Sequence, residues 1–170
     1  MPAAADTAKA HLDRARMLVR NSMTEARRYV WDLRSQELQK KDLPTALRDT
    51  TKRLTAESNI ETVVEVAGPL RPLPPEVETN LLRIGQEAIN NAVKHARANR
   101  REVGLNFDTR SVQLSVRDDG RGFDPSQQIA DGHFGLIGMR ERAEQIGGVI
   151  SVHSAIEGGT QIAVDVPLSD

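Results

Sequence analysis

The stretch SVQLSVRDDGRGFD at residues 111–124 decides the fold of this chain. It begins with alternating polar and apolar side chains, which predict a half-buried strand ending at Asp118. The turn that follows contains Gly120 and Gly122, and a plain loop is one interpretation, because glycine supplies positive φ wherever a chain reverses. The other interpretation is chemical. A carboxylate fixed at a strand end can accept a charge-assisted hydrogen bond from an exocyclic amine, worth about 1.5–3 kcal/mol, which is enough to select adenine over guanine.

A helix with a polar face is predicted upstream, over residues 75–96, because apolar side chains recur three and four positions apart. Glu87 and Asn91 are four apart and therefore lie on one side of it, with Lys94 and His95 one turn further on. A carboxylate and an amide so placed suit Mg²⁺ bound to substrate phosphates, whose charge Lys94 or His95 could neutralise. A solvated helix face is the alternative, although asparagine in mid-helix is unfavourable without a functional reason.

A third segment supplies Gly132, Gly135 and Gly138 around the start of a helix predicted over residues 137–146. Backbone amides at a helix start, unobstructed by side chains, form an anion site that favours phosphate. The glycine spacing matches neither the Walker lysine loop nor the strand-first dinucleotide turn. Near the C-terminus, two glycines and Thr160 open a strand, which indicates either a hairpin turn or a hydroxyl near the edge of a bound ring.

Four stretches together resemble the nucleotide-binding boxes of the GHKL ATPase superfamily: QEAINNAVKHA at 86–96, DDGRGFD at 118–124, GHFGLIGM at 132–139 and GGT at 158–160. The resemblance is closest to the catalytic ATP-binding domain of bacterial two-component sensor histidine kinases. The wording of the glycine boxes is similar to the subclass that signals to response regulators with helix-turn-helix DNA-binding outputs. The resemblance to the sensor kinases runs from about Leu43 to the C-terminus.

The resemblance implies a role for each matching polar residue. Asn91 matches the magnesium ligand, and Glu87 matches a polar support or water-positioning group. Asp118 matches the aspartate that recognises adenine, and Thr160 matches a threonine near the same ring. Six further positions match the family: Gly120 and Gly122 shape the ring slot, while Lys94, His95, Gly135 and Gly138 lie beside the phosphates. Residues 125–134 correspond to the lid that orders over ATP.

The N-terminal third has a different pattern. Apolar residues spaced three and four apart predict a helix over residues 6–37 with a seam for another helix, although a core-facing helix is the alternative. EARRYVWDLR at 25–34 also resembles the second dimerisation helix of the same kinases. We therefore expect a partial dimerisation region at 1–40 and a catalytic domain at 41–170. His11 precedes a leucine rather than an acidic residue, so it is not assigned as phosphoacceptor, and the acceptor helix is expected to lie outside this chain.

Composition restricts the function classes further. With 170 residues, 38% of them hydrophobic, the chain suits one globular domain with an appendage. A net charge of -1 provides no field for nucleic acid or anionic lipid, so neither direct nucleic-acid binding nor membrane contact is expected. The chain has no cysteine, which excludes disulfides and thiolate metal sites and fits a cytoplasmic location. The chain could also be the cytoplasmic part of a membrane-bound sensor, which is consistent with that location.

These observations predict an α+β fold, a two-layer α/β sandwich in which helices cover one face of a mixed, largely antiparallel sheet. The resemblance implies that ATP and Mg²⁺ bind there, and that the γ-phosphate passes to a histidine on a dimerisation helix for relay to a response regulator. The full-length protein is expected to be a homodimer, and this chain alone is not expected to autophosphorylate. Two alternatives stay open: a non-catalytic dimerisation or scaffold module of the same fold, and a GHKL serine kinase of the anti-sigma type.

Overall fold

The computed structural model describes residues 41–57, 60–124 and 134–168. The predicted dimerisation region at 1–40, with its long helix and His11, lies outside the described residues. So do residues 125–133 of the predicted lid.

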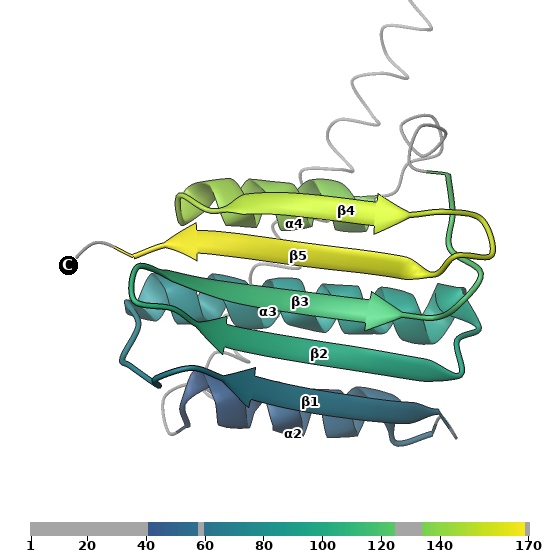
Figure 1. Cartoon of the computed structure of the whole chain (residues 1–170), viewed down its shortest axis with the longest axis horizontal. Helices are drawn as coiled ribbons and strands as arrows, with labels where there is room; N and C mark the ends of the chain where they lie inside the picture. The colour runs from purple at the N-terminus through teal and green to yellow at the C-terminus, as the bar shows by residue number, and fades with distance from the viewer. Residues whose placement is uncertain (1–40, 58–59, 125–133, 169–170) are drawn as a thin grey trace, which may run out of the picture. The chain divides into compact units, whose positions relative to one another are not determined.

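A single mixed sheet forms one layer of the described domain, with strand order β1-β2-β3-β5-β4 (Figure 1). β1 pairs with β2 in parallel, whereas β2–β3, β3–β5 and β5–β4 are antiparallel. The predicted mixed, largely antiparallel sheet is therefore confirmed. The strands are β1 (Glu61–Ala67), β2 (Arg100–Phe107), β3 (Ser111–Asp118), β4 (Val149–Ser154) and β5 (Thr160–Pro167).

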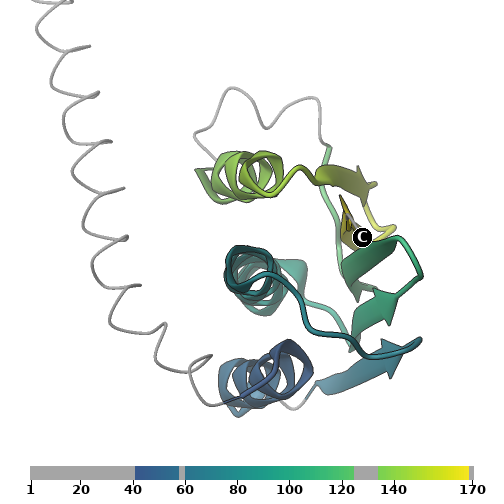
Figure 2. The same ribbon diagram turned by 90° about the vertical axis from the view of Figure 1, so that its left-hand side faces the viewer.

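Helices form the second layer and all lie on one face of this sheet, as Figure 2 shows from the side. The predicted two-layer sandwich is thus confirmed. α3 lies behind the middle of the sheet between the other two long helices, and a π-helical turn, η2, continues it without a break. The helical elements are α2 (Leu43–Thr55), α3 (Pro75–Asn91), η2 (Ala92–Ala96) and α4 (Phe134–Gln145).

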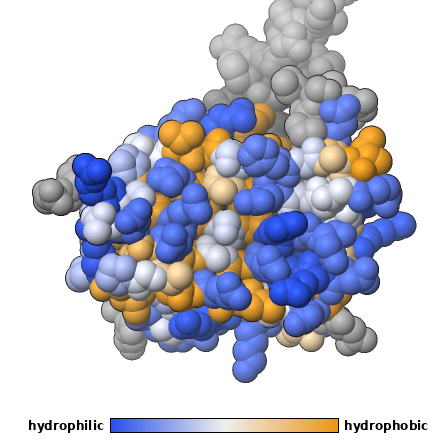
Figure 3. Space-filling model, in the orientation of Figure 1, coloured by the Kyte–Doolittle hydropathy of each residue, from blue (hydrophilic) through white to orange (hydrophobic). Residues whose placement is uncertain are grey.

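The core lies between the layers because alternate strand positions are apolar. On β3 the buried residues are Val112, Leu114 and Val116, and they pair with buried residues of β2 and β5. Burying such side chains stabilises the fold by about 1.5–3 kcal/mol each. The intervening positions, such as Gln113 and Arg117, are exposed on the outer face, which is mostly hydrophilic (Figure 3). The sheet is therefore half-buried, as the alternation predicts.

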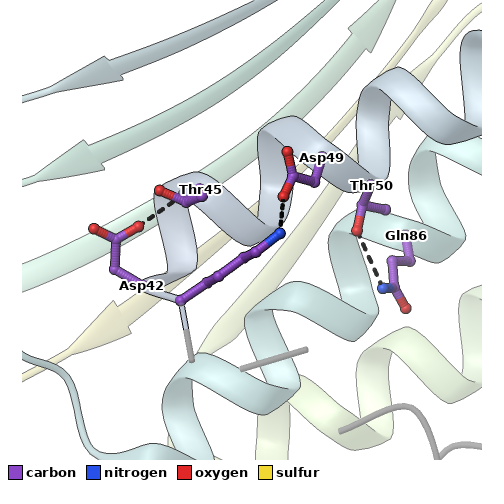
Figure 4. A network of polar contacts seen from close by, with 6 residues as sticks. Asp42, Thr45, Asp49, Thr50 and Gln86 are labelled. Atoms are coloured by element: carbon purple, nitrogen blue, oxygen red, sulfur yellow. Dashed lines mark hydrogen bonds and ion pairs between the residues drawn. The ribbon is translucent and has the colours of Figure 1, made fainter. Parts of the chain in front are cut away.

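Polar contacts fix the first helix of the domain. The Asp42 carboxylate accepts a hydrogen bond from the Thr45 backbone N–H at 2.9 Å, which caps α2 at the point where proline enters its first turn (Figure 4). Hydrogen bonding from the Thr45 side chain and, secondarily, from its backbone N–H lowers the pKa of Asp42. On the next turns, Gln86 of α3 donates to the buried Thr50 hydroxyl at 3.4 Å. α2 is therefore joined to α3, the helix that carries candidate site residues.

Two predicted helices differ in detail from the structure. The helix predicted over residues 75–96 ends as an α-helix at Asn91, and its last turn is the π-helix η2. α4 begins at Phe134 rather than at 137, so Gly135 lies inside its first turn rather than before the helix, and Gly138 lies one turn into it. Glycine disfavours helix by about 1 kcal/mol relative to alanine, but α4 packs against α3 and β4, and this packing outweighs the local preference.

Candidate nucleotide-binding site

Asp118 is the last residue of β3 and is only 7% exposed. Its side chain accepts a hydrogen bond from the Gly120 backbone N–H at 2.9 Å, so the turn that follows the strand holds the carboxylate in place. Burial raises the pKa of Asp118, while backbone N–H groups of Gly120 and Thr160 and the charge of Arg101 act in the opposite direction. The structure therefore presents a fixed, partly desolvated carboxylate, the kind of acceptor that the sequence predicted.

The glycine turn is clamped on both sides by backbone. A Cβ atom on Gly122, whose φ is +56°, would lie 1.9 Å from the Ala155 carbonyl oxygen in the β4–β5 hairpin. A Cβ on Gly120 would lie 2.2 Å from the Ala96 carbonyl oxygen at the end of η2. The Arg121 N–H also donates to that Ala96 oxygen, at 2.8 Å. These glycines are thus required for close backbone packing, and the ring slot expected from the resemblance remains a prediction.

Thr160 opens β5 and lies opposite Asp118 in the strand register. Its hydroxyl oxygen is 3.0 Å from the hydroxyl of Ser154. Ser154 is not among the site residues that the sequence predicted. The Ser154 oxygen accepts from the Phe123 backbone N–H at 2.9 Å and its hydroxyl lies 3.1 Å from the Gly159 carbonyl oxygen. Ser154 therefore joins the glycine turn to the hairpin. The observation that could have identified Ser154 is the strand register, because Ser154 and Thr160 pair across that hairpin.

Asp119, also absent from the predicted site, holds the turn to the start of β2. Its carboxylate accepts from the Asn99 and Arg100 backbone N–H groups at 2.8 and 2.9 Å. The bond from Arg100 is the main reason that the pKa of Asp119 is lowered. The two adjacent aspartates thus differ: Asp119 is exposed and structural, whereas Asp118 is buried.

An open hollow of about 540 Å³ lies at this end of the sheet. Asp118, Gly159 and Thr160 line it together, as predicted for two of these residues. Glu87 and Asn91 are not among its lining residues within the described part of the chain. The hollow is completed by residues of β3, β4, β5 and their hairpin: Arg117, Val152, His153, Ser154, Ala155, Gly158 and Gln161.

A second group of predicted residues meets where α3 packs against α4. A Cβ on Gly135 would lie 2.5 Å from Glu87 Oε1 and 3.3 Å from Asn91 Nδ2, so both side chains reach the space over this glycine. The predicted alignment of Glu87 with Asn91 on one side of the helix is consistent with this geometry. Lys94 and His95 follow in η2 and are exposed.

Gly138 differs from Gly135. Its carbonyl oxygen accepts from Arg142 Nη1 at 2.6 Å, and a Cβ there would meet only the end of this flexible side chain, at 2.9 Å. Packing within the described residues therefore does not require glycine at 138.

The turn η2 connects the two groups. It begins one residue after Asn91 and ends at Ala96, whose carbonyl receives the Arg121 N–H from the glycine turn. Within the described ranges there is no group of three His, Cys, Asp or Glu side chains able to hold a metal ion. Magnesium at Asn91 would thus need oxygens from another source, and nucleotide phosphates supply them.

Among the helices of the described residues, none combines the length and apolarity of a membrane span.

Comparison with known proteins gives a family match. Residues 76–170 match the family model described as "Histidine kinase-, DNA gyrase B-, and HSP90-like ATPase". This segment begins in the first turn of α3 and includes every predicted site residue.

Relatives are named as kinases. The chain is 30% identical over 154 residues to the signal transduction histidine-protein kinase/phosphatase DegS of Brevibacillus brevis, covering 91% of this chain and 40% of that protein. It is 32% identical over 166 residues to the sensor histidine kinase MctS of Rhizobium johnstonii, covering 96% and 36%. The chain thus spans well under half the length of these relatives.

Solved structures share the fold. The histidine kinase domain of the Erythrobacter litoralis EL346 blue-light activated histidine kinase superposes with a TM-score of 0.62 at 22% identity, over 75% of this chain and 61% of that one. The mycobacterial sensor histidine kinase MprB gives a TM-score of 0.55 at 21% identity, over 75% and 96%.

Proposed function

Because the chain belongs to the histidine kinase-, DNA gyrase B- and HSP90-like ATPase family, we propose that its residues 41–170 are the ATP-binding catalytic domain of a sensor histidine kinase. The observation that carries this proposal is the buried Asp118 carboxylate, which the Gly120 N–H fixes, on a residue that lines one hollow with Thr160. Two relatives are named as histidine kinases, and these names support phosphoryl transfer as the reaction type.

In this proposal Asp118 recognises the base. Its carboxylate accepts a hydrogen bond from the exocyclic amine of adenine, where guanine would present a carbonyl oxygen and leave the buried charge without a donor. Thr160 lies opposite in the register, and its hydroxyl adds a second polar group at the ring edge. The Gly120 backbone N–H holds Asp118 and the Ser154 hydroxyl contacts that of Thr160, so little reorganisation accompanies binding.

Asn91, with Glu87 beside it, would hold magnesium. Both side chains approach Gly135, and a carboxylate and an amide are suitable donors for a small hydrated cation that also binds phosphate oxygens. Bound magnesium neutralises charge on the phosphates. We assign Lys94 and His95 to the phosphate chain, and their exposure in η2, the turn that continues α3, supports this assignment.

Catalysis is then mainly positioning, as in other phosphoryl transfers. The bond between the γ-phosphorus and its bridging oxygen breaks, ADP leaves, and a histidine nitrogen forms the new bond to phosphorus. We propose that this histidine lies on a dimerisation helix of the full-length homodimer, which acts in the cytoplasm, and that a response regulator of the helix-turn-helix class receives the phosphate. The resemblance of the glycine boxes supports this choice of subclass.

Calorimetric titration with ATP and magnesium tests the proposal, using Asp118→Asn. We expect affinity to fall at least tenfold, which equals about 1.4 kcal/mol. The matched control is Asp119→Asn, which makes the same charge change one residue away on an exposed side chain and should retain wild-type affinity. A thermal melt of each variant ensures that a folded protein is measured. Equal affinity in wild type and Asp118→Asn would remove Asp118 from the site.

Phosphotransfer separates the kinase from a non-catalytic scaffold of the same fold. A dimerisation-helix domain carrying an acceptor histidine is added to the chain with labelled ATP. The kinase proposal predicts acid-labile label on that histidine, lost in Asn91→Ala. Binding of ATP with no transfer to any histidine would favour the scaffold.

A further inference from the structure

Arg101 is an unusual core residue. It lies on β2, is only 2% exposed, and heads the group of largest fully buried side chains in the described residues. A guanidinium cannot shed its charge easily, so its burial is costly unless an anion and hydrogen-bond acceptors lie nearby. The next two buried positions on the same face of β2, Val103 and Leu105, are apolar. The fold by itself therefore does not explain a charged residue at position 101.

The neighbours of Arg101 belong to both halves of the candidate site. Across the sheet it pairs directly with Asp118, and both side chains are buried beneath the helices. Directly opposed residues on paired strands have Cβ atoms about 4.5–5.5 Å apart, close enough for their charges to interact. On the helix side, Arg101 Nη2 donates to the Ala92 carbonyl oxygen at 3.4 Å. Ala92 begins η2 and directly follows Asn91.

Few other charges act on Asp118. Asp119 follows it and repels it, whereas Lys94 and His95 on η2 are exposed. The residues of β5 and β4 nearest to it in the register, Thr160 and Ser154, carry no charge. Arg101 is thus the cation that acts on this carboxylate among the described residues.

We propose that Arg101 is a positioning residue, which pairs with Asp118 across the sheet and ties the strand end at Asp118 to the helix end that carries Asn91. Its importance for nucleotide binding rests on the proposed function, whereas its effect on Asp118 does not. Arg101 acts through Asp118 and has no contact of its own with the nucleotide. Burial raises the pKa of Asp118 and the Arg101 charge opposes that rise, so removing the charge leaves burial unopposed. The carboxyl then binds a proton at higher pH and loses its charge-assisted hydrogen bond to adenine.

The test is a carbon-13 NMR titration of the Asp118 carboxyl in the full chain without nucleotide, comparing wild type, Arg101→Met and Arg101→Lys. In Arg101→Met we expect the midpoint to rise by about one pH unit, the lower end of the effect of a close opposite charge. Arg101→Lys retains the charge and should titrate near wild type. A midpoint in Arg101→Met equal to that of wild type would overturn the proposal, because a purely structural arginine would alter stability and not this titration.

A second measurement decides the case in which Arg101→Met does not fold. Urea unfolding compares Asp118→Asn with the double variant Asp118→Asn/Arg101→Met. If the two charges are partners, Asp118→Asn leaves the guanidinium uncompensated, and removing it as well restores part of the lost stability. If the double variant is no more stable than Asp118→Asn, the pairing is refuted.

ATP affinity against pH completes the experiment. Wild type should lose affinity as pH falls through the Asp118 midpoint, and Arg101→Met should lose it at a pH about one unit higher. Failure of wild type to bind ATP at any pH would contradict the proposed function alone. An unshifted Asp118 titration would contradict the role of Arg101 alone.

Discussion

The two halves of the candidate site are built differently. Around Asp118, backbone groups of the glycine turn, η2 and the β4–β5 hairpin interlock, and the carboxylate is buried. Around Asn91, side chains meet over one glycine, and Lys94 and His95 extend into solvent. The difference indicates that the proposed base recognition is fixed by the fold, whereas phosphate and metal binding depend on side chains free to adjust. Mutations should therefore affect stability in the first half and magnesium dependence in the second.

The largest expected effect is on the backbone of the first half. Gly122→Ala combines a positive φ with a clash against the Ala155 carbonyl, and we expect unfolding free energy to fall by about 3 kcal/mol or more. Gly147→Ala is the matched control, because Gly147 also has a positive φ (+66°) but nothing lies within 4 Å of its added Cβ. It should lose only the strain, about 1–2 kcal/mol. Equal losses of unfolding free energy in the two variants, measured by urea unfolding, would show that the close contact with the Ala155 carbonyl adds nothing to the backbone strain.

A side chain between α3 and α4 tests the second half. Gly135→Ala forces Glu87 Oε1 to move, since the new Cβ would lie 2.5 Å from it, but this oxygen is the far end of a flexible side chain and can move at little cost in stability. We therefore expect weaker magnesium-dependent ATP binding in Gly135→Ala, with little change in unfolding free energy. Gly138→Ala, which meets only the flexible Arg142 side chain, should change neither quantity. If calorimetry shows equal magnesium dependence in Gly135→Ala and wild type, the position of Glu87 over Gly135 does not matter for magnesium.

Asn91→Ala distinguishes the halves by their ligands. It should remove most of the gain in ATP affinity that magnesium provides, about tenfold or 1.4 kcal/mol, while leaving affinity for adenosine unchanged. Asp118→Asn should do the reverse, weakening adenosine and ATP alike with or without magnesium. Asn90→Ala, one position along the same helix, serves as the control in calorimetry. Loss of adenosine affinity in Asn91→Ala would mean that the two halves are not separate.

The smallest expected effect concerns Asp119 and pH. Its folded pKa is lowered, so its contribution to stability is complete above its ordinary value of 3.8 and disappears as pH falls through the folded value. Asp119→Asn should therefore be less stable than wild type at neutral pH by less than about 1 kcal/mol, because the group is exposed. Urea unfolding should show this difference begin to shrink below pH 3.8 and vanish once pH has fallen through the lower, folded pKa. A difference that persists at lower pH would assign it to hydrogen bonding rather than charge.

Much of the fold followed from local pattern. Alternation on Ser111–Asp118 predicted a strand whose last residue is the candidate base-binding aspartate, and the structure has that strand as β3. The resemblance to the ATP-binding domain of sensor histidine kinases is confirmed by the family match and the relatives. Patterns of this kind are local, and the sheet pairs neighbouring segments for most of its strands.

Strand register was beyond the sequence. The register that places Arg101 opposite Asp118, and the hairpin contact of Ser154 with Thr160, depend on how adjacent strands align, which the alternation within one strand does not encode. The π-helical turn and the early start of α4 depend on packing against other elements, which outweighs propensity. The sequence therefore identified residues with an expected chemical role better than those that hold them in place.

An NMR titration of the nitrogen-15-labelled chain with ADP, followed by Mn²⁺, tests most directly whether Asp118 and Asn91 serve one nucleotide. We expect ADP to shift the backbone amide resonances of Asp118, Gly120 and Thr160. Paramagnetic Mn²⁺, added next, should broaden Asn91 most strongly and only when ADP is present. Shifts confined to other parts of the domain, or Mn²⁺ broadening of Asn91 that does not depend on ADP, would contradict a shared site.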